Sequence, residues 1–582
     1  MSTEEIVLLG IITLMIIAML SERLSPDWIA LSTMLLLGLG GLVEKDQLLS
    51  GFSSSVVITL LGLFIITNAL EETGVAAWIA PRLEHLAGTS EARLIFLTML
   101  TGALLSLVMN NIAAGAVLLP MVMHISESRE IKPSRLLMPL SFGTLLGGMA
   151  TYFTSANIIL SDLLIEHGEA GLGMTDFLPT GGMIILGGLL YMYFVGRRQL
   201  PYRGTIRERL VEENLYHTYQ LGERLWVLEV STNSDLAKQS LNSSQIGKEL
   251  GLTILGVEQN RHLIAPPNPN TILQPGAHLW VVGRGDRVEL LLEHGLKQVR
   301  PSPPVQGQQF TEIVIPPRSS AIHKTLKDLE FRNRYGLSVV ALWREGRSYR
   351  TDVGDFQLQV GDALLVQGDT EALNSHDYLF LHHQQVASPR KMLTALLITV
   401  AVLVIAIFKL FPLPEVMLGG GLALVASGNL TMEQAYEAIE WRVLFLIAGL
   451  LPISIAMVNS GLASHLSRVL FEYTAGYSSL TIIMGLFILA VVVTQIIGGQ
   501  VTALVIGPIA ISTALQTKVD PQATAVAVAI GCSTAFLTPI AHPVNLLMMG
   551  PGGYTFVDFV KVGMGMFFTT SIFLLIGLVL FW

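Results

Sequence analysis

The stretch LTPIAHPVNLLMMGPGGYTF, residues 537–556, lies in a run apolar enough to cross a membrane, yet prolines, a histidine and an asparagine interrupt it. Pro539 and Pro543 lack a backbone N–H and break a helix, and a half-helix can restart at Asn545. Irregular backbone is tolerated at membrane depth only where it packs within protein or lines a cavity, because unpaired N–H and C=O groups are costly in lipid. The stretch therefore indicates a membrane protein with a broken helix inside it.

The composition places the chain among α-helical polytopic membrane proteins. Of its 582 residues, 51% are hydrophobic and 14% are charged, and the apolar residues are gathered in long runs. The formal net charge of -9 discourages nucleic-acid binding, so no nucleic-acid partner is expected. Cys532 is the single cysteine, which excludes a disulfide framework and a Cys-based metal site.

The sequence also bears on processing and on catalysis. The N-terminal run MSTEEIVLLGIITLMIIAML begins with acidic residues and has no positive region or clear cleavage site. We expect it to be a retained first span, not a signal peptide. No catalytic triad, H-E-x-x-H, P-loop or paired catalytic carboxylate appears, so we expect a protein that is not an enzyme.

The apolar runs form two sets, separated by the polar and charged residues 200–390. Each set contains five spans and one interrupted apolar pair, which we interpret as a hairpin. In the first set the spans lie near 5–21, 27–43, 55–71, 135–164 and 178–196, with the pair at 93–125. In the second set they lie near 392–411, 414–428, 442–459, 521–549 and 559–581, with the pair at 479–512.

The two sets resemble each other in sequence. At an offset of 387, GLFIITNALEETGVA from 62 pairs with GLLPISIAMVNSGLA from 449. At an offset of 388, SLVMNNIAAGAVLLP from 106 pairs with TQIIGGQVTALVIGP from 494, and Asn157 pairs with Asn545. Matches in register over both halves favour duplication. Because each copy has an odd number of crossings, the second must be inverted, which is the inverted-repeat plan of many secondary transporters.

The loops predict the orientation in the membrane. The positive residues lie on the same side as the insert, and they are Arg129, Lys132, Arg135, Arg197, Arg198 and Arg203. The opposite side carries Glu166, His167, Glu169 and Asp176 without a lysine or arginine. The positive-inside rule then places the insert in the cytoplasm and both termini outside a plasma (inner) membrane.

Four small, polar breaks interrupt the apolar runs. They are AHPVN at 541–545, TSAN at 154–157, and the hairpin tips MNNIAAG from 109 and GGQVTAL from 498. Inverted symmetry would bring all four to the bilayer midplane. There, half-helix N-termini offer N–H groups to an anion, while freed carbonyls and hydroxyls suit a small cation. The breaks therefore predict a binding site, although each alone could be a proline kink between packed helices.

The hairpins, the broken helices and above all TPIAHPVNLLMMGPGGYTFVDFVKVG, residues 538–563, resemble the divalent anion/sodium symporter (DASS) family of the ion transporter superfamily. The resemblance covers both membrane halves. It implies a homodimer with a scaffold domain and a moving transport domain, an elevator mechanism, and sodium ions bound beside the substrate. No tightly bound cofactor is expected.

The hairpin tips depart from the family pattern, which is Ser-Asn-Thr preceded by a hydroxyl residue. Residues 110–112 read Asn-Asn-Ile with Ser106 upstream, whereas residues 498–500 read Gly-Gly-Gln with Thr494 upstream. In the family the tips grip the two ends of a dicarboxylate, so the departure favours a compact oxyanion such as sulfate, coupled to sodium or protons. A di- or tricarboxylate symporter and a membrane anion sensor stay open as alternatives, and Gln500 could take the asparagine role.

The resemblance supplies the predicted site residues. The predicted substrate ligands are Asn111, Ile112, Thr154, Ser155, Asn157, Gln500, Thr502, His542 and Asn545. The predicted sodium ligands are Ser106, Asn110, Asn111, Ala156, Thr494, Gly498, Gly499 and Ala541. His542 is either a neutral histidine hydrogen-bonded in the loop or a group that contacts the anion or titrates with transport. The asparagines could equally cap helices.

The insert contains a second duplication. LEVSTNSDLAKQSLNSSQIGKELGLTILGV from 228 and IVIPPRSSAIHKTLKDLEFRNRYGLSVVAL from 313 each predict a strand, a helix and a strand, followed by L-Q-x-G and a last strand. These two α+β modules resemble the C-terminal domains of regulator-of-potassium-conductance proteins (RCK_C). The resemblance implies dimerisation and a regulatory ligand, cyclic di-AMP in some relatives; the modules could also only stabilise a dimer. No G-x-G-x-x-G follows a strand, so NAD is not expected.

The predicted domain organisation follows from these two duplications. A first transmembrane repeat covers 1–199, RCK_C-like domains cover 205–297 and 305–388, and a second transmembrane repeat covers 390–582. The predicted fold is thus an inverted repeat of five spans plus a re-entrant hairpin, with a pair of small α+β domains inserted between the copies.

Overall fold

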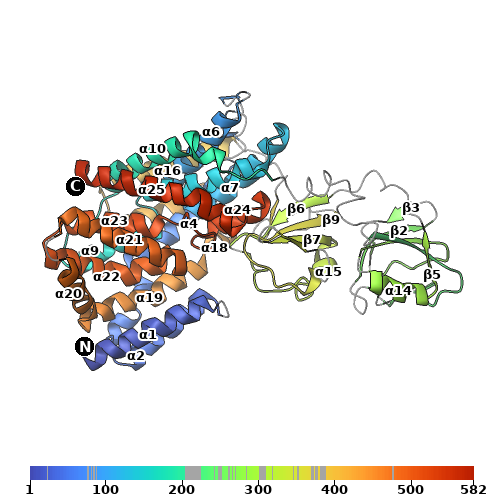
Figure 1. The fold of residues 1–582 in the computed structure, drawn as a ribbon, viewed down its shortest axis with the longest axis horizontal. Coiled ribbons are helices and arrows are strands. Elements are labelled where there is room, and N and C mark those ends of the chain that lie inside the picture. Colours follow the sequence, from blue (N-terminus) through green and yellow to red (C-terminus); the bar gives the residue numbers. More distant parts are fainter. Residues whose placement is uncertain are drawn as a thin grey trace.

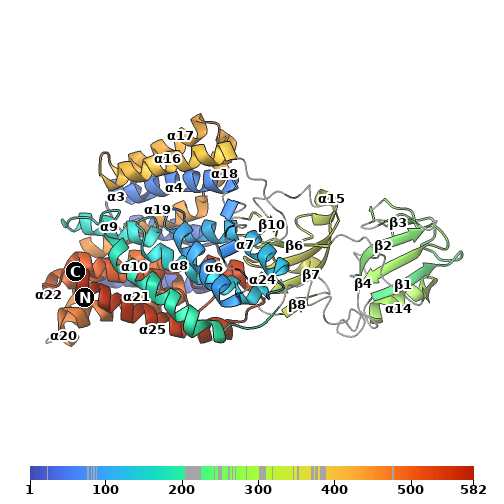
Figure 2. The same ribbon diagram turned by 90° about the horizontal axis from the view of Figure 1, so that it is seen from above.

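The computed structural model has a large helical part and two small sheets that lie beside one end of it (Figure 1, Figure 2). The structure describes residues 1–21, 24–74, 78–79, 82, 85–86, 88, 90–203, 225–241, 243–244, 246, 252–259, 262–264, 267–268, 270–282, 285–299, 310–317, 319–344, 347–349, 353–368, 373, 378–380, 389–474 and 477–582.

The first half of the chain forms the predicted spans and hairpin. Its helices are α1 (Thr3–Leu20), α2 (Pro26–Leu39), α3 (Lys45–Leu48), α4 (Ser55–Glu72), α6 (Glu91–Ser106), α7 (Asn111–Ser128), α8 (Leu137–Met149), α9 (Ser155–Glu166) and α10 (Phe177–Phe194). Short 3-10 turns are η1 (Ser50–Ser53), η2 (Pro133–Arg135) and η3 (Gly196–Arg198). The hairpin is α6 with α7, and the broken span is α8 with α9.

The second half repeats this order. Its helices are α16 (Pro389–Ile407), α17 (Leu413–Ala426), α18 (Met432–Ala438), α19 (Trp441–Asn459), α20 (Leu462–Thr474), α21 (Ser479–Ile497), α22 (Gly499–Thr517), α23 (Pro521–Ser533), α24 (Pro543–Gly552) and α25 (Phe556–Phe581). The hairpin is α21 with α22, and the broken span is α23 with α24. Helices α18 and α20 fall outside the predicted spans.

Length and apolar composition allow eight of the described helices to cross a membrane. In α1 and α16 only 22% of the residues are buried within the protein, which leaves most of their apolar surface for contact with lipid. Three shorter apolar helices, α2, α17 and α23, add to this set. The chain is therefore a multi-pass membrane protein, and the predicted fold class is confirmed.

Equivalent helices of the two halves pack in equivalent pairs. Helix α2 packs on α19 as α17 packs on α4, and α6 packs on α8 as α21 packs on α23. Helix α7 packs on α24 as α22 packs on α9. Each half thus contributes helices to the packing of the other, and the repeat seen in the sequence is also a repeat of contacts.

Glycines mark the same close crossings in both halves. A Cβ at Gly62 would overlap the backbone of Met417, and a Cβ at Gly449 would lie 2.9 Å from the carbonyl carbon of Ala30. Gly62 and Gly449 are 387 positions apart, as are Ala30 and Met417. The crossing of α4 with α17 and the crossing of α19 with α2 therefore have a glycine at the same position of the repeat. Only glycine lets these backbones approach so closely.

The insert forms two antiparallel sheets of the same topology. The first module contains β1 (Leu225–Val230), β2 (Thr253–Gln259), β3 (His262–Ile264), β4 (His278–Val282), α14 (Gly285–Glu293) and β5 (Leu296–Val299), in the order β3-β2-β4-β1-β5. The second contains β6 (Phe310–Val314), α15 (Phe331–Tyr335), β7 (Ser338–Arg344), β8 (Arg347–Tyr349), the turn η4 (Val353–Asp355), β9 (Ala363–Gln367) and β10 (Leu379–Phe380), in the order β10-β6-β9-β7-β8.

The two orders are identical when β1 to β5 are matched with β6 to β10. Each sheet also has a register shift at the same place, between Ile254 and Gly256 in the first and between Val339 and Ala341 in the second. The predicted pair of α+β modules is confirmed. Residues 205–224, 247–251, 305–309 and 381–388 lie outside the described residues, and they include part of the stretch between β1 and β2 in which a helix was expected. The domain boundaries stay predictions.

Candidate functional site

The four breaks fall where four half-helices begin. Helix α7 begins within the first hairpin tip and α22 within the second, while α9 and α24 begin after the irregular residues 150–154 and 534–542. In the first repeat, the Asn111 side chain lies against Gly148, directly before the break. In the second, a Cβ at Gly498 would lie 3.9 Å from the Ala541 carbonyl oxygen. Each tip thus meets the break of its own repeat.

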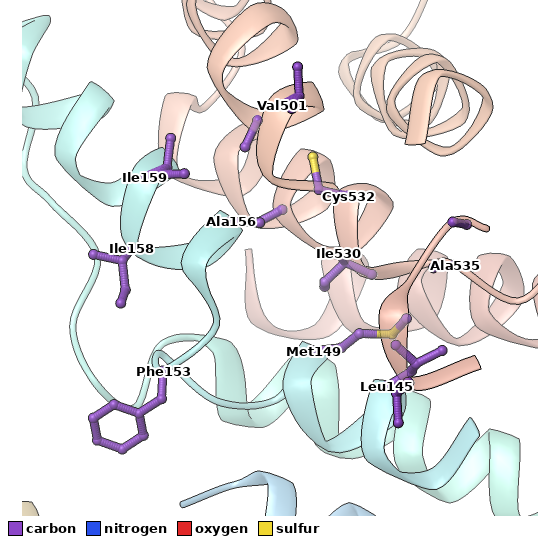
Figure 3. Packing of buried hydrophobic residues seen from close by; sticks show 14 of the residues in the cluster. Leu145, Met149, Phe153, Ala156, Ile158, Ile159, Val501, Ile530, Cys532 and Ala535 are labelled. Atoms are coloured by element: carbon purple, nitrogen blue, oxygen red, sulfur yellow. The ribbon is translucent and has the colours of Figure 1, made fainter. Parts of the chain in front are cut away.

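The two repeats also meet at this depth. Figure 3 shows Ala156 at the start of α9 close to Val501 of α22 and to Ile530 and Cys532 of α23, with Met149 of α8 beside them. Ala156 is 5% exposed and Val501 is 4% exposed. The predicted residues at the starts of α9 and α22 therefore lie in one buried region.

The first hairpin tip is held by two asparagines. Asn110 Oδ1 accepts from the Ala113 N–H at 2.8 Å and caps α7, as the capping alternative expected. Ser106 Oγ donates to Asn111 Oδ1 at 2.7 Å, and both residues are buried. The structure therefore brings Ser106 and Asn111 together, whereas the Asn110 side-chain oxygen is used to cap α7.

Asn157 closes the first break. Its Nδ2 donates to the carbonyl oxygens of Thr151 at 2.6 Å and Gly148 at 3.2 Å. Thr154 Oγ1 also donates to the Gly148 carbonyl, at 3.3 Å. Because both amide N–H groups are used on the backbone, Asn157 has none left to donate to an anion.

Asn545 closes the second break in the same way. Its Nδ2 donates to the carbonyl oxygens of Ala535 at 2.6 Å and Thr538 at 3.3 Å. Its Oδ1 accepts from Ser141 Oγ of α8 at 2.6 Å. All the polar atoms of this fully buried side chain are therefore occupied within the protein.

The two asparagines differ in one partner. The position equivalent to Ser141, 388 residues further on, is Ala529, which has no hydroxyl. Helix α23, which carries Ala529, packs on α9, which carries Asn157. Within the described part of the chain, Asn157 Oδ1 is buried and has no hydrogen-bond partner. An unpaired carbonyl oxygen at the break is suited to a cation, since it cannot donate to an anion.

The second tip needs glycine at both positions. Gly498 has φ 79, in the left-handed region. A Cβ at Gly499 would overlap the carbonyl oxygen of Cys532, because the start of α22 packs directly on the backbone of α23. In the first repeat the position equivalent to Gly499 is Asn111, and its side chain lies against Gly148. The departure from Ser-Asn thus has a steric reason.

Two of the four half-helix starts are capped and two are not. His542 Nδ1 accepts from the Val544 N–H at 3.2 Å and caps α24, as Asn110 caps α7. Helix α9 begins after Thr154 and α22 after Gly498, and neither has a side-chain cap. The free N–H groups and the positive end of the helix dipole at these two starts favour an anion.

The remaining predicted residues differ in what they can offer. Thr502 Oγ1 donates to the Gly498 carbonyl at 2.8 Å, so its hydroxyl is used by its own helix. Ser155 and Gln500 are half-buried and follow the two uncapped starts. Ile112, Ala156 and Ala541 can contribute only backbone groups, and Thr494 is fully buried.

Gln495 was missed by the sequence analysis. Its Nε2 donates to the Thr534 carbonyl at 2.8 Å and to the Val491 carbonyl at 3.2 Å, which ties α21 to the second break. Its Oε1 is a buried atom without a partner among the described residues. An amide directly after Thr494, inside an apolar run, was the signal that could have found it.

The sequence matches the family model described as "CitMHS: Citrate transporter" over residues 16–531. An uncharacterized transporter of Synechocystis sp. is 30% identical, over 95% of this chain and 93% of its own. The transporter YfbS of Escherichia coli (strain K12) is 30% identical, over 97% of each chain. Sodium/sulfate cotransporter 2 of Chlamydomonas reinhardtii is 24% identical, over 58% of this chain and 40% of its own.

Among solved structures, the YdaH transporter of Alcanivorax borkumensis aligns with a TM-score of 0.43 and 12% identity. The alignment covers 92% of this chain and 85% of that one. A likeness at this level adds nothing to the fold described above.

Proposed function

Because the chain belongs to the CitMHS citrate transporter family, we propose that it is a secondary active transporter that carries a small divalent anion, sulfate, together with sodium. The family and the relatives above are transporters and not enzymes. The substrate, the coupling ion and the residues that bind them are the content of the proposal.

The observation that carries the proposal is the pair of uncapped helix starts at Thr154 and Gly498. Backbone N–H groups at such starts bind oxyanions without a charged side chain. Ser155 and Gln500 lie next to these starts and can add a hydroxyl and an amide. A buried site of this kind can bind an anion at membrane depth with no lysine or arginine in it.

Sulfate fits this site better than a dicarboxylate. A dicarboxylate needs two separated grips, but the amides of Asn157 and Asn545 are used on the backbone and the second tip is Gly-Gly. A tetrahedral ion is compact enough for two helix starts. The relative described as a sodium/sulfate cotransporter supports this choice. A di- or tricarboxylate is the second candidate, which the description of the family favours.

Sodium would bind where unpaired oxygens face the breaks. In the first repeat the unpaired oxygen is Asn157 Oδ1. The hydrogen-bonded oxygens of Ser106 and Asn111 and the backbone carbonyls near Asn110 and Ala156 would complete the site. In the second, Gln495 Oε1 joins the predicted ligands, which are Thr494, Gly498, Gly499 and Ala541. Carbonyl and side-chain oxygens at broken helices are the ligands that sodium uses in such transporters. We therefore propose Asn157 as a sodium ligand and no longer as a substrate ligand.

The proposal includes the finer predictions made from the family resemblance and from the charges of the loops. These are a homodimer that works by an elevator motion, termini outside, and cytoplasmic RCK_C-like modules that regulate transport, with a cyclic dinucleotide as a candidate ligand. Since coupling between sites is reciprocal, a ligand of the modules would have to change the affinity for the transported anion.

A flux assay tests the proposal. Purified protein in proteoliposomes is given an inward sodium gradient and labelled sulfate, phosphate, succinate or citrate. We expect sulfate to accumulate, and to accumulate less when choline replaces sodium. Accumulation of citrate or succinate alone would establish the second candidate. Sulfate binding without uptake or counterflow would mean a sensor.

A further inference from the structure

The second module is docked on the helical part through one face of its sheet. Ile313, Leu364 and Val366 point into the core of the module, whereas Val314 and Leu365 belong to the buried apolar cluster of the membrane helices. Successive residues of a strand point to opposite faces, so the sheet has two buried faces. One of them covers its own core, and the other covers helices.

The docked face contacts the two half-helices whose starts are side by side. Strands β6 and β7 pack on α24, and β10 packs on α7. Figure 1 shows α24 beside β6, between the helical part and the sheet. A Cβ at Gly115 of α7 would meet the Val544 side chain, one residue into α24, so these two helices also meet at their starts. The module therefore contacts elements that carry the candidate site.

The closest approach is between backbones. A Cβ at Gly361, in the turn before β9, would overlap the Leu546 carbonyl group of α24. A Cβ at Gly550, one helical turn further along α24, would overlap the Gly361 carbonyl oxygen. Gly361 thus packs between Leu546 and Gly550 of α24. A methyl group added at Gly361 or at Gly550 would push the module away from α24.

The first module has the same turn but no such contact. Gly276 has φ 84 and its equivalent Gly361 has φ 82, so both turns use the left-handed backbone. A Cβ at Gly276 would meet nothing within 4 Å. The module fold alone therefore does not cause docking on the membrane helices, and Gly276 is a matched control position for Gly361.

The docked face also carries polar groups that weaken it. Gln367 on β9 and Ser338 on β7 pair directly across the sheet, on the face of Leu365. They are 2% and 3% exposed, and their side-chain polar atoms have no partner among the described residues. Water would satisfy these atoms if the face opened, because burying an unpaired polar group is costly. Such a face suits a contact that opens and closes.

The chain connects the module to other helices. After the second module the chain enters α16, which packs on α17 and α4, whereas the docked face holds α7 and α24. A displacement of α7 and α24 against α4 and α17 must therefore either carry the module with it or break the contact at Gly361.

We propose that the contact of the second module with α24 is an autoinhibitory clamp, which holds the site in one position until the module releases. The inference rests on the proposed function, since it describes how transport at that site is restrained. Release at Gly361 frees α24 to move and raises the rate of transport.

The test compares three single variants of the full chain in proteoliposomes. Gly361→Ala and Gly550→Ala place a methyl group on either side of the contact, and Gly276→Ala places one in the open turn. Sodium-driven uptake of labelled sulfate should rise roughly fivefold or more in the first two, the range of typical allosteric coupling, and stay at the wild-type rate in Gly276→Ala. Equal rates in all three, or slower uptake in the first two, would overturn the clamp.

Hydrogen exchange gives a readout that needs no substrate. Both docking variants should exchange faster in residues 356–366 and in residues 543–552, and the control in neither. Gly550→Ala keeps a helical backbone, so it preserves the test if the strained turn of Gly361→Ala prevents folding. If wild-type protein moves no sulfate, the proposed function fails, and exchange then decides: faster exchange that reaches 543–552 supports the clamp, and exchange confined to the turn overturns it.

Discussion

The unpaired oxygen of Asn157 leads to a prediction about Ala529. Ser141 gives Asn545 Oδ1 a hydroxyl partner at 2.6 Å, and the equivalent Ala529 leaves Asn157 Oδ1 without one. If that oxygen binds sodium, the hydroxyl of Ala529→Ser should compete with the ion. A net hydrogen bond is worth about 1 kcal/mol, so the sodium concentration for half-maximal effect should rise about fivefold.

The assay follows thermal unfolding with a dye that reacts with thiols. Cys532 is the single cysteine and is buried, so the dye reports when the membrane core opens. A ligand at about 100 times its Kd adds about 2.7 kcal/mol of stability, which gives a measurable shift in the unfolding temperature. The shift is recorded against sodium concentration, with choline keeping the ionic strength constant.

Ser141→Ala is the matched control. It removes the bond to Asn545 and should lower stability by about 2 kcal/mol, since it leaves a buried oxygen unpaired. Its sodium dependence should nevertheless stay that of wild type. An unchanged sodium dependence in Ala529→Ser, with that variant more stable at every sodium concentration, would mean that Asn157 Oδ1 only lacks a hydrogen bond and binds no ion.

Three further outcomes are expected. Gly499→Ala should lower the unfolding temperature in the same thiol assay, because its Cβ would overlap the Cys532 carbonyl; an unchanged temperature would contradict the steric account of the second tip. Ser106→Ala should raise the sodium concentration needed for half-maximal uptake more than Thr494→Ala does, because Asn111 adds a side-chain oxygen beside Ser106 whereas its equivalent Gly499 adds none; equal effects would contradict this difference between the repeats. His542→Asn should preserve the cap of α24 and keep uptake, whereas His542→Leu should cost about 1 kcal/mol of stability; loss of uptake in His542→Asn at normal stability would give the ring a role in binding.

Local patterns in the sequence predicted the parts of the fold that depend on neighbours in the chain. The prolines and small polar residues at 154–157 and 541–545 predicted both breaks, and the register of the two halves predicted the repeat. The duplicated L-Q-x-G turns predicted two sheets of one kind. These features follow from backbone chemistry and apolar spacing, which act over a few residues.

Side-chain roles that depend on contacts between residues far apart in the chain could not be predicted from the sequence. The role of Asn545 depends on Ser141, which is 404 positions away, and on carbonyls freed by the break. The two turns have similar sequences, but Gly361 packs on α24 whereas Gly276 faces open space. The local sequence does not predict this difference. The motif alone predicted Asn157 and Asn545 as substrate ligands. That both side chains donate their amide N–H groups to backbone carbonyls is visible only in the folded chain.

The most direct test of the central claim removes one backbone N–H from the start of α9. Proline is accepted at the first helical position, and Thr154 has φ -84 and ψ 142, which suits a residue before proline. Equilibrium binding of labelled sulfate in saturating sodium is measured for Ser155→Pro and for Ser155→Ala, which keeps the N–H. A hydrogen bond to a charged group is worth about 1.5–3 kcal/mol, so Ser155→Pro should weaken sulfate binding at least about tenfold, with a normal unfolding temperature, beyond any effect of Ser155→Ala. Equal sulfate affinity in the two variants would contradict an anion site at this helix start.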